Sequence, residues 1–132
     1  MNIKRSIDIE DEVRTALSSY LTAYCRPLPS AYTLPNILVS QVGGSEADQI
    51  DTFEVVLDSR AEDEATALET LRNAVALLRA IAEGQTTAIR HVVINSSGSW
   101  GRDPVRPDLA MCSARLRITV HLEDATFPES GE

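Results

Sequence analysis

The stretch LAMCSARLRITVHL, residues 109–122, alternates apolar and polar side chains almost without a break. Successive side chains of a β-strand point to opposite faces of a sheet, so this alternation predicts a strand with one buried and one exposed face. A chain with such a strand needs a sheet that is covered on one side only. The predicted inward positions are Cys112, Ala114, Leu116, Ile118, Val120 and Leu122, and the outward ones are Ser113, Arg115, Arg117, Thr119 and His121.

Three further segments, residues 36–42, 52–60 and 88–95, have the apolar run or the alternation that is typical of strands. The first is closed by Gly43-Gly44 and followed by a polar segment, so we expect it to form a hairpin with the second. One face of the second strand is predicted to be buried through Phe53, Val55 and Leu57.

Two segments show helical periodicity instead. Apolar residues recur at three- and four-residue steps from Ser6 to Tyr24, and more strongly from Ala61 to Ala82. Acidic residues crowd the first turns of both segments, where exposed amides favour negative charge, so we interpret them as helix starts rather than metal sites. These acidic residues are Asp8, Glu10, Asp11 and Glu12 in the first segment and Glu62, Asp63 and Glu64 in the second.

The order of elements is therefore helix, strand, strand, helix, strand, strand. It predicts one α+β domain over residues 1–132, with a mainly antiparallel four-stranded sheet and two helices packed on one face. The other face of the sheet is expected to be polar. Residues 123–132 are expected to be a solvated C-terminal tail.

The charge balance narrows the choice of partners. Twenty acidic and twelve basic side chains give a net charge of −8, which argues against a protein that reads DNA through a broad basic face. An acidic passage through which DNA slides is compatible with this charge. Cys25 and Cys112 match no metal or redox spacing, so we expect reduced thiols in a protein made in the cytoplasm. No apolar run approaches the roughly 20 residues of a membrane span, and we expect no membrane partner.

The residues that usually carry catalysis are poorly placed here. His91 and His121 lie in predicted strands with no Ser, Cys or acidic partner at a recognisable spacing. Cys112 is predicted to face the core, where burial raises the pKa of a thiol. No nucleophile elbow, phosphate loop or dinucleotide fingerprint is present, so we predict no enzyme activity and no catalytic, cofactor or metal site.

The loop SSGSWGRDPVRPDL, residues 96–109, holds the only Trp of the chain. Trp and Arg are enriched among the residues that dominate binding energy at protein interfaces. The candidate assembly interface is therefore Trp100, Arg102, Arg106, Arg115 and Arg117. Two alternatives stay open: Trp100 caps its own sheet or contacts a partner, and Arg115 and Arg117 meet carboxylates of a neighbouring subunit or face water.

Nearly the whole chain resembles the tail terminator, or tail completion, proteins of long-tailed bacteriophages. The resemblance rests on an N-terminal helix, on LPNILVSQVGGSEADQIDTFEVVLDSRAEDEATALETLRNAVALLRAI, and on the closing strand RPDLAMCSARLRITVHL. In the first stretch a proline-led strand, a Gly-Gly turn and a second strand run into an Ala-rich helix. In the closing strand, Arg residues point outward.

The resemblance implies a structural role in the virion. Proteins of this family form a ring, usually of six copies, on the last ring of the tail tube, where they end tail polymerisation and provide the surface for joining the head. The implied partners are further copies of the chain, the tail tube protein and a head-tail connector or neck protein, with DNA passing through the lumen. The implied location is the tail or neck of the virion, after synthesis in the host cytoplasm.

Three other functions remain as alternatives. One is another completion protein of the neck or head-tail connector. A second is a small α+β ligand-binding domain or enzyme, in which His121, Arg115 and Arg117 converge on an anionic ligand at the polar sheet face. A third is an adaptor domain that dimerises through its sheet edge with two-fold symmetry.

Overall fold

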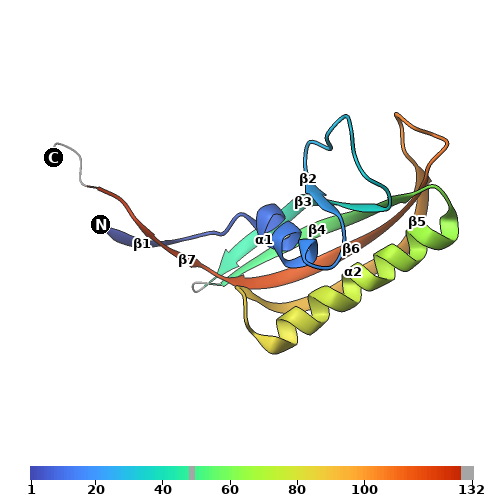
Figure 1. The fold of residues 1–132 in the computed structure, drawn as a ribbon. Coiled ribbons are helices and arrows are strands. Elements are labelled where there is room, and N and C mark those ends of the chain that lie inside the picture. The colour runs from blue at the N-terminus through green and yellow to red at the C-terminus, as the bar shows by residue number, and fades with distance from the viewer. Residues whose placement is uncertain (48–49, 129–132) are drawn as a thin grey trace.

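A computed structural model describes residues 1–47 and 50–128 (Figure 1). Seven strands and two helices follow one another in this part of the chain. In chain order they are β1 (Asn2–Arg5), α1 (Ile9–Ser18), β2 (Ala23–Cys25), β3 (Asn36–Ala47), β4 (Ile50–Ala61), α2 (Glu64–Gly84), β5 (Ile89–Arg102), β6 (Ala110–His121) and β7 (Glu123–Thr126).

The main sheet has the strand order β2-β3-β4-β6-β5, in which β2 runs parallel to β3 and every other neighbouring pair is antiparallel. The α+β class and the mostly antiparallel sheet are thus confirmed. The predicted four-stranded sheet is wrong, because the structure has a five-stranded mixed sheet and a separate two-stranded sheet of β1 and β7. The three additional strands, β1, β2 and β7, are only three or four residues long, which is too short for local periodicity to reveal.

The first helix is shorter than its periodicity predicts. Asp8 caps its N-terminus by accepting a hydrogen bond from the amide of Asp11 at 3.2 Å, which supports our interpretation of the acidic cluster as a helix start. The helix ends at Ser18, and residues 23–25 pair with β3 as strand β2. Leu21 still packs against the core from the turn after the helix, so its helical spacing reflects burial rather than a continuing helix.

The hairpin of β3 and β4 is longer than expected. Gly43 and Gly44 lie inside β3, where a bulge between Gln41 and Gly43 shifts the register, and pairing continues to Ala47 and Ile50. A Cβ atom on Gly44 would stand 3.0 Å from Cδ1 of Phe53 and 3.0 Å from the carbonyl oxygen of Thr52, so the close approach of the strands favours glycine there. The Gly-Gly pair therefore marks a bulged strand rather than the hairpin turn.

Helix α2 is the long helix that the periodicity predicts. Asp63 caps its N-terminus by accepting from the amide of Thr66 at 2.7 Å, and Gln85 ends it in the left-handed conformation at φ 53°. Its buried face carries several alanines, which let the helix lie close to the sheet. That face consists of Ala67, Leu71, Ala74, Val75, Leu78 and Ala82.

The core lies between the sheet and both helices. The alternation of the long β6 strand is confirmed, because Cys112, Ala114, Leu116, Ile118 and Val120 are all buried. They share one apolar cluster with the inward residues of β3 and β4 and with the buried faces of α1 and α2, so the helices cover the same face of the sheet (Figure 1). The opposite face carries the polar residues of β4 and β6.

Candidate assembly surfaces

The five candidate interface residues do not form a single patch. Trp100 and Arg102 lie at the end of β5, and Arg106 follows in the loop that leads to β6. Arg115 and Arg117 project from β6 on the polar face. The structure thus brings the candidates together in two groups, one at an end of the sheet and one on its open face.

Trp100 is neither buried nor fully exposed. Strand β5 continues to Arg102, so Trp100 stands in a strand rather than in a loop, paired with Cys112 of β6. Paired residues of an antiparallel ladder share a face, which places Trp100 on the helix side of the sheet. Its exposed fraction of 47% leaves about half of a large aromatic side chain in solvent. About half of the Trp100 side chain is therefore covered by its own chain, and contact of the exposed half with a partner stays a prediction.

The loop between β5 and β6 comprises residues 103–109 and is organised by Asp103. One oxygen of its carboxylate accepts from the amides of Val105 at 2.8 Å and Arg106 at 3.2 Å. The other oxygen accepts from Nε of Arg60 at 2.7 Å, at the end of β4. The loop is therefore pinned to the sheet by a buried ion pair.

Burial and hydrogen bonding act against each other on Asp103. Burial by itself raises the pKa of this carboxyl, but the hydrogen bonds from Arg60 and from the loop amides outweigh it, so the pKa lies below its ordinary value of 3.8. The side chains of Arg60 and Asp103 are only 9% and 6% exposed. A charged carboxylate whose two oxygens both accept hydrogen bonds thus holds the loop in place.

A pocket of about 450 Å³ opens between this loop and the segment that joins β2 to β3. Its residues come from both loops and from the buried ion pair, with Leu28, Pro29 and Tyr32 on one side and Val105 and Arg106 on the other. Sequence reasoning missed this pocket, because nothing local marks Arg60 as buried. The Asp103-Pro104 step is the one sequence signal nearby, since Asp-Pro is typical of a turn start.

The polar face of the sheet is cross-linked by opposite charges. Nη1 of Arg115 lies 3.5 Å from Oε2 of Glu54, and Nη2 of Arg117 lies 3.7 Å from Oε1 of the same carboxylate. His121 and Arg117 line separate shallow hollows. The three side chains that the ligand-binding alternative would bring together therefore do not line one pocket.

Strands β1 and β7 form an arm that extends away from the body of the molecule (Figure 1). Its base carries two exposed ion pairs, Lys4 with Asp124 at 2.5 Å and Arg5 with Glu123 at 3.5 Å. Its tip carries exposed apolar side chains, Met1, Ile3 and Phe127. The segment 123–132 was expected to be a solvated tail, and the pairing of Glu123–Thr126 with the N-terminus corrects that expectation for β7.

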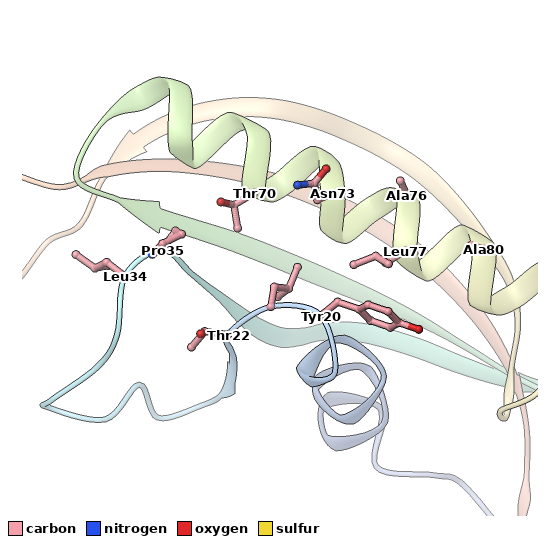
Figure 2. A pocket seen from close by; sticks show the side chains of 10 residues that line it. Tyr20, Thr22, Leu34, Pro35, Thr70, Asn73, Ala76, Leu77 and Ala80 are labelled. Carbon is pink, nitrogen blue, oxygen red and sulfur yellow. The ribbon is translucent and has the colours of Figure 1, made fainter.

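An uncharged groove of about 610 Å³ runs between α2 and the segments on either side of β2. Figure 2 shows Asn73, Ala76 and Leu77 of α2 along one side and Tyr20, Thr22 and the Leu34-Pro35 turn along the other. The residues lining it include no Asp, Glu, His, Cys, Lys or Arg, so the groove offers apolar and neutral polar contacts.

The sulfur chemistry agrees with the sequence analysis. Burial raises the pKa of the Cys112 thiol, as predicted, and also that of Cys25.

Among residues 1–47 and 50–128, no three His, Cys, Asp or Glu side chains gather in a way that could hold a metal ion. No helix in the described part of the chain is long and apolar enough to cross a membrane.

The chain matches no protein-family model and no curated protein sequence. The resemblance to tail terminator proteins therefore rests on the quoted stretches of sequence.

Proposed function

We propose that this chain is a structural virion protein that forms a ring on a phage tail tube, ends tail polymerisation and provides the surface for head-tail joining. Six copies are the expected ring, as the family resemblance implies. The tail tube protein and a connector or neck protein are the proposed neighbours, and the proposed location is the tail or neck of the virion.

The arm of β1 and β7 is the observation that carries the proposal. In the described part of the chain, the two strands have each other as their main contact, and the apolar side chains of Met1, Ile3 and Phe127 stay exposed at the tip. An apolar tip on a projecting ribbon gains free energy only when another molecule covers it. The arm therefore supports a role in assembly.

The position of the arm also favours a ring. It extends from one end of the molecule, whereas the loops that carry Tyr32 and Arg106 project at the other end (Figure 1). Contacts between unlike patches at opposite ends are heterologous, and they close into a ring when the rotation between copies allows it. A two-fold adaptor would instead bury the same patch of both copies.

The net charge of −8 fits the proposed conduit for DNA. An acidic wall repels the phosphate backbone, so DNA passes without being held. On the open sheet face, both Arg115 and Arg117 lie beside Glu54, which reduces the positive charge that this face offers to DNA.

The test is the mass of the purified protein in solution at several concentrations, by sedimentation or native mass spectrometry. We expect the mass to rise to that of a closed ring, and Phe127→Glu to prevent this while leaving the circular dichroism spectrum unchanged. Leu68→Glu is the matched control, because it places the same charge at an exposed apolar position on α2. A protein that stays monomeric, together with tails of normal length assembled in its absence, would contradict the proposal.

A further inference from the structure

The pocket between the loop of residues 103–109 and the segment before β3 contains a hydrogen-bonding group that the chain does not satisfy. Nε of Arg60 donates to Asp103, but Nη1 is buried and has no hydrogen-bond partner among the described residues. Arg60 lines the pocket. A buried donor without an acceptor is costly, and native proteins leave few of them, so an acceptor from outside the chain would be stabilised here.

The pocket also shows what kind of acceptor fits. Asp103 bonds the guanidinium of Arg60 through Nε and not through Nη1, so Nη1 is left for another acceptor. A second guanidinium stands nearby, because Arg106 lines the same pocket. Arg106 pairs with Asp108 at 2.8 Å, but both side chains are about half exposed, and such surface pairs contribute little and rearrange readily. Asp103 also lines the cavity and neutralises Arg60, so the lining keeps one net positive charge when Arg106 turns from Asp108 to a ligand, and this charge favours a carboxylate.

The walls of the pocket indicate what carries the carboxylate. Leu28, Pro29 and Val105 line it, and Val105 is 84% exposed, so its apolar side chain is accessible to a ligand. A free anion gains nothing from such walls. A carboxylate on a peptide with apolar neighbours gains from both the walls and the guanidinium groups, as at other interfaces with a polar centre and apolar contacts.

We propose that this pocket binds a glutamate or aspartate side chain on an acidic peptide segment of a partner protein. The carboxylate enters to the depth of Arg60 and accepts from Nη1 while Arg106 closes over it. Apolar side chains next to it in the peptide pack on Leu28 and Val105. The binding does not depend on ring formation and goes beyond the proposed function.

The test uses the full-length ¹⁵N-labelled protein and two short peptides, Gly-Val-Glu-Val-Gly and Gly-Val-Gln-Val-Gly, both acetylated and amidated. We expect the Glu peptide to shift the Nε–H resonance of Arg60 and the amide resonances of the non-proline residues within 28–32 and 103–106. The Gln peptide is expected to bind about tenfold more weakly, because it replaces a charge-assisted hydrogen bond by a neutral one. Equal binding of the two peptides, or no shift with either, overturns the proposal.

Three variants locate the site. Arg106→Gln and Val105→Asp change exposed side chains at the rim and are expected to weaken binding of the Glu peptide by at least about threefold and about tenfold, respectively. Arg79→Gln is the matched control, because Arg79 is exposed on α2 and does not line this pocket, and it should leave binding unchanged. Undiminished binding in both rim variants overturns the proposed site. A ring without peptide binding refutes this inference alone, and peptide binding without a ring refutes only the proposed function.

Discussion

Replacing Asp103 by alanine tests whether its carboxylate fixes the loop of residues 103–109 to the sheet. The substitution removes the carboxylate that accepts from Arg60 at 2.7 Å and from the amides of Val105 and Arg106 at 2.8 and 3.2 Å. It leaves a guanidinium group buried without its counter-charge, since the Arg60 side chain is 9% exposed. Breaking one side of a buried ion pair costs about 3–5 kcal/mol of unfolding free energy.

This loss is measurable by urea denaturation. A single domain of this size unfolds in one cooperative step, and a slope of about 2 kcal/mol per molar urea converts a loss of about 4 kcal/mol into a midpoint lower by about 2 M. Asp103→Asn should cost about 1–2 kcal/mol less than Asp103→Ala, because the amide oxygen still accepts from the two loop amides.

The double variant Arg60→Met with Asp103→Leu tests whether the cost of each single change comes from leaving the other charge buried without a partner. It removes both charges and keeps apolar volume, so we expect a stability within about 2 kcal/mol of the wild type, although each single change is costly. The two buried charges would be independent of each other if each single variant lost less than about 1 kcal/mol of unfolding free energy and the double variant lost the sum of the two. That result would contradict the prediction.

The same pair predicts how stability changes with pH. The pKa of Asp103 is lower in the folded chain than its ordinary value of 3.8, so the folded state favours the charged form. Its contribution to stability is therefore complete above about pH 4 and is lost as the pH falls through the folded-state pKa. The stability difference between the wild type and Asp103→Asn should shrink in that acidic range, as urea midpoints at several pH values would show. A difference that stays constant down to pH 2 would contradict it.

Three further predictions follow from particular residues. Asp51 is 2% exposed, and neither of its carboxylate oxygens has a hydrogen-bond partner among the described residues. Asp51→Val should therefore raise the unfolding free energy by about 1–3 kcal/mol, and a lower urea midpoint would contradict this. Gln85 ends α2 at φ 53°, so Gln85→Gly should raise the unfolding free energy by about 0.5–1 kcal/mol, visible as a higher melting temperature, whereas Gln85→Ala should not. Trp100→Ala should weaken assembly by about 2 kcal/mol, about thirtyfold in Kd by sedimentation, and keep the monomer folded; loss of the fold would instead show that Trp100 acts within its own core.

Local patterns predicted the body of this fold. Alternation located β4 and β6 and assigned the correct side chains to the core, and helical spacing located α2. These signals are readable because each reflects the burial of one face along a continuous element. Where burial continued past the end of an element, as at Leu21 after α1, the same signal overestimated the helix.

The candidate site was predictable only by residue type. Trp and Arg indicated contact surfaces, but the sequence could not show that Arg115 and Arg117 flank Glu54 on the polar face of the sheet. Nor could it show that Trp100 pairs with Cys112 and therefore lies on the other face, the one that the helices cover. Arg60 and Asp103 are 43 residues apart, and no spacing rule connects them. Neither residue was therefore a candidate.

The order of apolar and polar residues along the chain sets which faces are apolar, and so the class of fold, because the hydrophobic effect acts on each strand and helix through its own periodicity. Tertiary structure decided everything that depends on pairing between distant segments. The joining of residues 2–5 with residues 123–126 in an arm, the parallel contact of β2 with β3, and the burial of the Arg60–Asp103 pair all arise this way. Backbone hydrogen bonds and ion pairs are available to almost any segment, so only the packed chain selects which partners meet.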